Sequence, residues 1–354
     1  MTTVTERVQA CLDTEIDRQR EVLRELGPDI ADLLDVTSAL LRGGKRLRAS
    51  FLTWGYCAVA GLRVEDAPDD VILMATSMEF FQAAALLHDD VMDGSDTRRG
   101  APSAHVELAR RHVERGWDGP AERFGLAGAV LAGDLCLTAS DELMARAGLP
   151  ALEAAREMFA VMRTQLMAGQ FLDVVESVRP WASLPGAERL ERADRVIRFK
   201  SAKYSVEHPL LIGALAAQAT REQVEALSRY GLDIGRAFQL RDDLLGVFGD
   251  PAVTGKPAGD DLREGKRTVL VAAVLERLDE AGAARLIDGL GTDDPAVVAD
   301  LQRIIAGSGG VEWVEERIAA LTQDALAALT SANLAPTGYA GLADLARLAT
   351  QRTA

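Results

Sequence analysis

The stretch VILMATSMEFFQAAALLHDD, residues 71–90, decides the fold of this chain. Apolar residues occupy almost every side of the helix that it would form, and they do not alternate as in a half-buried strand. A helix that is apolar nearly all round has to be enclosed by other elements. We therefore expect a central helix near residues 69–93 with further helices around it.

Helical spacing of apolar residues continues through most of the chain, whereas strand signals are scarce. The composition is 48% hydrophobic but only 5% aromatic, and it is rich in Ala and Leu, which favours helix over sheet. Breaks rich in Gly and Pro separate helices expected near residues 3–25, 30–42, 45–60, 69–93, 122–147, 150–177, 187–199, 202–218, 221–246, 266–288, 294–306, 310–331 and 337–350. Because no internal repeat and no Ser/Gly-rich linker divides the chain, we predict one all-α domain over residues 1–354.

The net charge and the spacing of the cysteines limit the classes of function that this chain can have. A net charge of −15 argues against nucleic acid or an anionic membrane as the main partner, although it allows an anionic substrate where basic residues are concentrated. The first residues, MTTVTERVQACLDTEIDRQR, lack the apolar core of a secretory signal, and no apolar run approaches the roughly 20 residues of a membrane helix. Cys11, Cys57 and Cys136 have no metal-type spacing and are expected to be free thiols. The protein is predicted to be cytoplasmic, without stable membrane insertion.

Three aspartates end the central helix in HDDVMD, residues 88–93. Asp89 and Asp93 are four residues apart and share one helical face, and Asp90 is turned from them by about 100°. Such an incomplete set of hard oxygen ligands suits Mg²⁺, which keeps waters and takes its remaining oxygens from substrate phosphates. The pattern favours a magnesium site.

Two simpler interpretations are a solvated helix end and a calcium loop. Acidic residues favour helix N-termini, because of the helix dipole, whereas these residues lie at the other end of an apolar helix. A calcium loop needs oxygen ligands at its third and twelfth positions, and Val91 and Gly100 stand there. The calcium loop is excluded, and the solvated helix end stays open as the alternative.

A second acidic pair, Asp242 and Asp243, lies near the end of the helical stretch IGRAFQLRDDLLGVFGD, residues 234–250. Two such helix ends could face each other across a cavity mouth, where Mg²⁺ ions would bridge them through a diphosphate. A concentrated basic stretch, RGGKRLR at residues 42–48, offers cations, and its two glycines permit close approach of an anion. Taken alone, such a basic run is usually a solvated face.

Together these motifs resemble those of the trans-isoprenyl diphosphate synthases, the family of farnesyl and geranylgeranyl diphosphate synthases. DDVMD (89–93) and DDLLG (242–246) match the two aspartate-rich motifs, except that Gly246 stands where a third Asp is common, with Asp250 four residues on. The resemblance covers about residues 40–270. It implies a helical bundle of the isoprenoid synthase type around a central apolar cavity, and a homodimer.

The resemblance also implies a reaction, a head-to-tail (1'-4) prenyl transfer from a C5–C15 allylic diphosphate to isopentenyl diphosphate. Mg²⁺, three ions in the family with Mn²⁺ as a substitute, would be held by Asp89, Asp93 and Asp242. The isopentenyl diphosphate site would comprise Lys45, Arg48, Gln82 and Arg99. The allylic diphosphate site would comprise Arg98, Lys203, Gln239, Lys256 and Lys266, of which Arg98, Lys203 and Lys256 would take part in catalysis. Supporting positions would be Asp90, Gln170, Asp173 and Asp243.

Product length is predicted from the helix that precedes Asp89. Ala85 and Ala84 lie one turn before it, roughly 6–7 Å away, and Phe81 lies two turns before it, roughly 12 Å away. The alanines leave the way open, so Phe81 is expected to help form the floor and the product is expected to be geranylgeranyl diphosphate. Farnesyl diphosphate or a longer polyprenyl diphosphate are the alternatives, and Phe81 as an ordinary core residue is the alternative for that side chain.

Two other classes of protein share parts of this pattern. A class I terpene cyclase has the same fold and first aspartate motif, but it has no use for the second diphosphate site that GGKRLR implies. A non-catalytic partner subunit of a prenyltransferase is expected to lose aspartates from the first motif, whereas all three are present. Gly246 keeps this second alternative open.

Overall fold

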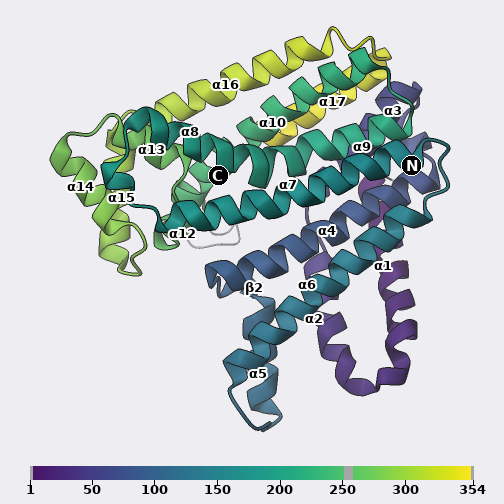
Figure 1. Ribbon diagram of the computed structural model, residues 1–354, viewed down its shortest axis with the longest axis horizontal. Coiled ribbons are helices and arrows are strands. Elements are labelled where there is room, and N and C mark those ends of the chain that lie inside the picture. The colour runs from purple at the N-terminus through teal and green to yellow at the C-terminus, as the bar shows by residue number, and fades with distance from the viewer. Residues whose placement is uncertain (1–2, 251–257, 352–354) are drawn as a thin grey trace.

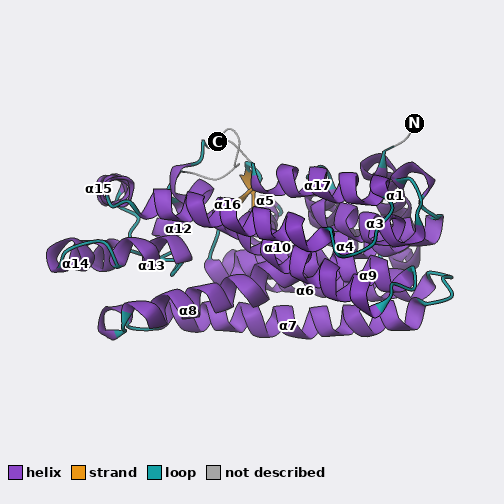
Figure 2. Cartoon of the chain, turned by 90° about the horizontal axis from the view of Figure 1, so that it is seen from above, coloured by secondary structure: helices purple, strands orange, loops and turns teal. Residues whose placement is uncertain are grey.

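The computed structural model describes residues 3–250 and 258–351, and helices dominate this part of the chain (Figure 1). The long helices lie side by side along the molecule, and a view from above shows the same alignment (Figure 2). The α-helices are α1 Val4–Leu23, α2 Ala31–Leu41, α3 Leu47–Ala60, α4 Asp69–Asp93, α5 Ala104–Glu114, α6 Ala121–Arg146, α7 Leu152–Val178, α8 Gly186–Val196, α9 His208–Ala216, α10 Arg221–Phe248, α12 Asp260–Arg263, α13 Val269–Leu275, α14 Glu280–Gly289, α15 Pro295–Gly307, α16 Gly310–Leu329 and α17 Pro336–Thr350. The all-α prediction is confirmed.

The central position of α4 is confirmed. Helices α1, α2, α3 and α6 all pack against it. Its aromatic residues Phe80 and Phe81 are fully buried, as is Met74. The apolar character of this helix on all sides thus has its structural counterpart in neighbours on all sides.

Two parts of the chain differ from the sequence prediction. Helix α5 and a short hairpin of β1 (Thr97–Arg98) and β2 (Ala101–Pro102) occupy a stretch where no element was predicted, because its many charged residues hide a narrow apolar face. The helix predicted over 266–288 is two helices, α13 and α14. Asp279 lies between these two helices and is the N-cap of α14, since its side chain accepts a hydrogen bond from the Gly282 amide.

A π-helical segment, Ile197–Glu207, joins the helices that were predicted as separate near 187–199 and 202–218. Two glycines on neighbouring helices allow close approach to it. A Cβ at Gly169 of α7 would lie 2.5 Å from the backbone of Phe199, and one at Gly235 of α10 would lie 2.5 Å from the carbonyl oxygen of Ala202. Helices α7 and α10 therefore reach this segment at backbone distance, and π-helical turns of this kind are frequent at functional sites.

The buried apolar side chains form three clusters, one around α4, one around α8, α13 and α15, and one around α9 and α17. The clusters share helices, because α3 contributes to the first and third and α10 to the second and third. A single domain over 1–354 stays a prediction. Cys11, Cys57 and Cys136 are free, as expected.

Candidate active site

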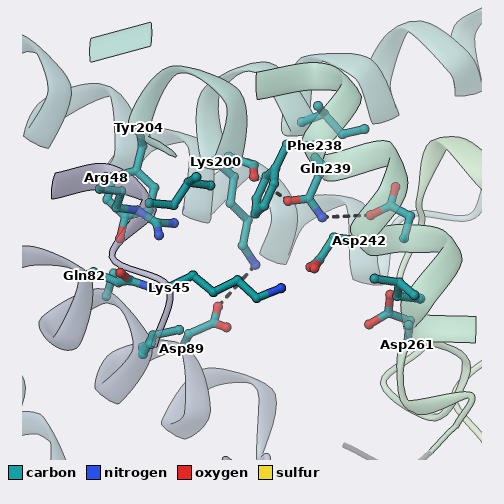
Figure 3. A pocket seen from close by; sticks show the side chains of 18 of the residues that line it. Lys45, Arg48, Gln82, Asp89, Lys200, Tyr204, Phe238, Gln239, Asp242 and Asp261 are labelled. Atoms are coloured by element: carbon teal, nitrogen blue, oxygen red, sulfur yellow. Dashed lines mark hydrogen bonds and ion pairs between the residues drawn. The ribbon is translucent and has the colours of Figure 1, made fainter. Parts of the chain in front are cut away.

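A cavity of about 1020 Å³ opens between the C-terminal ends of α4 and α10. The start of α3, the π-helical segment and helix α7 also line it, as do residues of α8, α12 and α17. Figure 3 shows Asp89 on α4 and Asp242 on α10 with their carboxylates directed toward the same space, into which Lys45 and Lys200 also extend. The structure thus brings together the two acidic motifs and the basic stretch, which lie far apart in the sequence.

Asp89 is held by two donors on its own side of the cavity. Gln170 Nε2 donates a 3.0 Å hydrogen bond to Asp89 Oδ1, and Lys200 Nζ lies 3.2 Å from the same oxygen. Lys200 also donates to Asp173 Oδ2 at 2.6 Å. The predicted supporting residues Gln170 and Asp173 therefore lie at the first acidic motif, and Lys200 ties them together.

Asp90 points away from this group and is almost completely buried. Arg98 Nε donates to its Oδ1 at 2.8 Å, and the Arg98 guanidinium also lies 3.8 Å from Asp89. Arg98 lines the cavity. Asp90 consequently fixes Arg98 at the cavity wall, which is the supporting role predicted for it.

The second acidic motif is tied to the π-helical segment. Gln239 Nε2 donates to Asp243 Oδ1 at 2.8 Å, and Ser201 Oγ donates to Gln239 Oε1. Burial and, next, the nearby Asp261 carboxylate raise the pKa of Asp243 well above its ordinary value. Asp242, Asp243 and Gln239 all line the cavity.

Gly246, the departure from the second motif, leaves space that another carboxylate fills. A Cβ at position 246 would lie 2.0 Å from Oδ2 of Asp261, a residue of α12. Asp261 lines the cavity, whereas Asp250, the replacement that the sequence suggested, is absent from the described lining. The side chain beside Gly246 is therefore Asp261, which sequence reasoning missed.

The basic stretch turns sharply before α3. Gly44 has φ +89°, and Arg46, with φ +49°, uses the left-handed region as the N-cap of α3. Lys45, Arg46 and Arg48 all line the cavity, but Arg46 is buried in an ion pair with Glu79 at 3.0 Å. The turn thus brings three cations to the cavity, and one of them is already paired with a carboxylate.

Arg48 is positioned from the opposite wall. Its Nη2 donates to Ser205 Oγ at 2.7 Å, and its guanidinium stacks 4.1 Å from the ring centre of Tyr204. Arg99 donates to the carbonyl oxygen of Leu40 at 2.9 Å and packs beside Gly44. Gln82 also lines the cavity, so all four residues of the predicted isopentenyl site face it.

The structure corrects the prediction for Lys203. Its Nζ lies 2.9 Å from Glu207 Oε2, and it lines a separate pocket on the other side of the π-helical segment. Lys200, three residues earlier, is the lysine of this segment that reaches the cavity. In an ordinary helix residues three apart share a face, but the wider π-turn separates these two side chains.

Two further lysines, Lys266 and Lys256, were predicted at the allylic diphosphate site. Lys266 lines the cavity, 3.3 Å from Asp261 and 3.8 Å from Asp93. Lys256 lies outside the described residues. Glu264, which the sequence did not single out, accepts a 3.0 Å hydrogen bond from Ser95 and pairs with Lys266. These contacts join the end of α4 to the residues after α12.

Of the residues predicted to control product length, Ala85 lines the cavity, while Ala84 and Phe81 are absent from its described lining. Tyr204 does line it, and its ring contacts Phe81 edge-on at 5.7 Å. Phe81 also contacts Phe159 at 6.0 Å. Phe81 therefore lies behind Tyr204, in a second layer of the cavity wall.

The donor set fits Mg²⁺. Oδ2 of Asp93 and Oδ2 of Asp243 are buried and have no hydrogen-bond partner among the described residues. Within the same residues no three acidic, histidine or cysteine side chains converge into a closed metal cluster. An open arrangement of hard oxygen ligands is what Mg²⁺ uses when phosphate oxygens and waters complete its shell. Asp89, Asp93 and Asp242 would hold it; Asp89 and Asp242 line the cavity, whereas Asp93 is absent from its described lining.

The raised pKa of Asp93 predicts that the effect of this carboxylate on the melting temperature of the metal-free protein depends on pH. Burial and, next, the Asp89 carboxylate raise its pKa to about 6. A carboxyl group whose pKa is higher in the folded state than in the unfolded state destabilises the fold when it is ionised. Without metal, Asp93→Asn should therefore melt at a higher temperature than the wild type at pH 7.5, and the difference should shrink as the pH falls to 5. Thermal melts at both pH values check this, and an unchanged difference would contradict it.

The sequence pattern of the polyprenyl synthetase family matches residues 31–307. A short chain isoprenyl diphosphate synthase of Methanothermobacter thermautotrophicus is 31% identical over 84% of this chain and 83% of that protein. A geranylfarnesyl diphosphate synthase of Aeropyrum pernix is 34% identical over 78% of this chain and 79% of that protein.

Solved structures give the same answer. The crystal structure of a geranylgeranyl pyrophosphate synthase of Corynebacterium glutamicum, complexed with isoprenyl diphosphate and magnesium, superimposes with a TM-score of 0.93. It is 38% identical, and the match covers 100% of this chain and 99% of that one. The facing acidic motifs, the basic turn and these likenesses lead to one conclusion: the chain belongs to the polyprenyl synthetase family and is a prenyltransferase.

Proposed function

We propose that this enzyme joins an allylic diphosphate of C5–C15 to isopentenyl diphosphate, head to tail, and that its main product is geranylgeranyl diphosphate. One observation carries the proposal. Two carboxylate-bearing helix ends and a separate turn with Lys45 and Arg48 line one cavity, so that two anionic substrates can be held together. Fixing two reactants in a reactive geometry can lower a barrier by about 7–11 kcal/mol.

On the metal side the chain holds the leaving diphosphate. Bound Mg²⁺, three ions with Mn²⁺ as a substitute, would supply positive charge to the departing oxygens. Arg98, fixed by Asp90, and Lys200, fixed by Asp89 and Asp173, add side-chain cations at the same wall. Lys266 extends this cationic wall, and Lys256 keeps its predicted role from the sequence alone.

On the other side the chain holds isopentenyl diphosphate and orients its double bond. Lys45, Arg48, Gln82 and Arg99 provide donors for that diphosphate. No side-chain nucleophile is required, because the double bond attacks the allylic cation and the released diphosphate accepts the final proton. Tyr204, Leu166 and Phe238 line the interior and keep water from the cation.

The reaction is tested by incubating the purified enzyme with Mg²⁺, isopentenyl diphosphate and each of the C5, C10 and C15 allylic diphosphates, followed by chain-length analysis. We expect a C20 diphosphate whose formation stops when Mg²⁺ is chelated. Incubation with geranylgeranyl diphosphate alone should give no hydrocarbon, which separates this enzyme from a cyclase. Absence of elongation with every primer would support the non-catalytic subunit.

Two lysines of the π-helical segment form a matched pair for this assay. Lys200→Met should lower kcat by about 100-fold or more, because a preorganised cation at the leaving group is lost. Lys203→Met should leave kcat nearly unchanged and lower the melting temperature slightly, since Glu207 keeps its 2.7 Å hydrogen bond from Ser228. The reverse order of effects would show that the predicted Lys203, and not Lys200, serves the reaction.

We infer that product length is set in two layers. Tyr204 closes the interior wall, and Phe81 supports it from behind. The small Ala85 leaves the path beside Tyr204 open, which supports a product longer than C15. Growth beyond C20 would have to displace both rings, which are buried.

Phe81→Ala should therefore shift the product distribution to chains longer than C20. Phe80→Ala is the matched control, because Phe80 is equally buried and lies on another side of α4. Either truncation should cost about 3–5 kcal/mol of unfolding free energy, but only Phe81→Ala should change the product. Equal product profiles, measured by chromatography of the dephosphorylated alcohols, would leave Phe81 as an ordinary core residue.

We further propose a homodimer that covers α6. In the described residues two helices, α4 and α6, are long and apolar enough to cross a membrane by length and composition. The apolar window of α4 is 72% buried in the core, whereas that of α6 is only 39% buried, and Leu131 on α6 is 57% exposed. A second copy of the chain fits this face, in keeping with the predicted cytoplasmic enzyme without membrane insertion.

Leu131→Glu should convert the dimer to a monomer or weaken it strongly, because a charge would be buried in the interface. Val113→Glu, at an apolar residue of α5 that is even more exposed, should leave the dimer intact. Light scattering after size-exclusion chromatography measures both. A wild-type monomer that binds neutral vesicles would point to a membrane as the occupant of this face.

A further inference from the structure

Arg267 lies in the cavity wall but belongs to none of the predicted sites. It follows Lys266 directly and precedes Thr268, whose side chain caps α13. Its guanidinium nitrogens Nε and Nη1 are buried and have no hydrogen-bond partner in residues 3–250 and 258–351. No ion pair of Arg267 occurs among those residues either. A cation with two unsatisfied donors therefore borders the space where anionic substrates would bind.

Arg267 as a whole is partly buried, but the burial of its two unpaired nitrogens has a cost. Arginine is rarely buried unless it is paired, because leaving water without a compensating charge is unfavourable. The same burial lowers the pKa of Arg267. An anion that enters the cavity would supply partners for these two nitrogens.

Arg48 Nε, in the predicted isopentenyl site, is likewise buried without a hydrogen-bond partner among the described residues. The cations beside the acidic motifs differ. Lys200 contacts Asp89 and Asp173, Lys266 contacts Asp261, and Arg98 contacts Asp90. Those cations are already balanced by carboxylates in the metal-free protein. Arg267 has no such carboxylate in the described part of the chain, so its full charge is available to a ligand.

We propose that Arg267 binds phosphate oxygens of a diphosphate in this cavity, as a further substrate-binding residue. That the diphosphate is part of a prenyl substrate rests on the function proposed above. In the planar guanidinium, Nε shares one edge with Nη2, and Nη1 shares the end edge with Nη2. Each of the two unpaired nitrogens therefore belongs to an edge that can pair with two oxygens of a phosphate. Isopentenyl diphosphate and the allylic diphosphate carry the same group, and kinetics can distinguish them.

The proposal predicts opposite effects on stability and on binding. Arg267→Met retains much of the apolar bulk and removes the unpaired charge. Without ligand, the variant should melt at the same temperature as the wild type or higher. The rise in melting temperature that inorganic diphosphate causes, measured with and without Mg²⁺, should be clearly smaller in the variant. A residue with a structural role alone would lower the first temperature and leave the second quantity unchanged.

Steady-state kinetics then identifies the substrate. Arg267→Met should raise KM for one of the two diphosphates by about tenfold or more, the loss expected for a charge-assisted hydrogen bond, with a smaller change in kcat. Arg267→Lys should restore part of the affinity, because it keeps the charge but not the two-pronged geometry. Arg277→Met is the matched control, since Arg277 stacks on Trp313 after α13 and does not line the cavity.

Failure of this inference is distinguishable from failure of the proposed function. If Arg267→Met binds inorganic diphosphate as the wild type does and keeps both KM values, Arg267 has no part in substrate binding, whatever the enzyme makes. If the wild type elongates no prenyl primer, the thermal measurements with inorganic diphosphate still decide whether Arg267 binds this anion.

Discussion

Mutual repulsion among neighbouring carboxylates is the constraint on which this structure depends. Asp89, Asp93, Asp242, Asp243 and Asp261 lie at one end of an apolar bundle, where Asp243 is buried, Asp242 is exposed and the other three are partly buried. Burial raises the pKa values of Asp93 and Asp243, and the neighbouring carboxylates of Asp89 and Asp261 raise them further. Two lysines relieve the repulsion between these carboxylates in part. Lys200 bridges Asp89 and Asp173, and Lys266 lies between Asp93 and Asp261.

The same lysines are suited to contact either a carboxylate or an anion. Each lysine has a flexible stem and a single charged nitrogen, so it could turn from its carboxylates toward an anion if metal ions took its place. Backbone geometry makes this arrangement possible. Gly169 brings α7 against the backbone of Phe199 and Lys200, and Gly235 brings α10 against Ala202. The π-helical segment then directs Lys200 toward α4 and Ser201 toward Gln239.

The sequence predicted the features that depend on local pattern. Helix α4 follows from its apolar surface, and the two acidic motifs and the basic turn follow from charge concentrated at helix ends. The error at Lys203 arose because the family resemblance was placed on one of two lysines three residues apart, and the π-helical segment directs the other, Lys200, to the cavity. Helix α5 was missed because its apolar face is narrow. Tyr204 in front of Phe81, and Arg267 without a partner, depend on tertiary packing that no single segment encodes.

Gly246 shows how the absence of a motif residue can mislead when only the sequence is considered. Loss of a carboxylate from the second motif suggested a weakened metal site and kept a non-catalytic role open. In the folded chain the space at position 246 adjoins the carboxylate of Asp261, and any side chain at 246 would have to displace it. The local concentration of acidic groups is therefore preserved, although one of them comes from α12 and not from α10. Since metal binding depends on where oxygens lie and not on which helix carries them, Gly246 is no argument against catalysis.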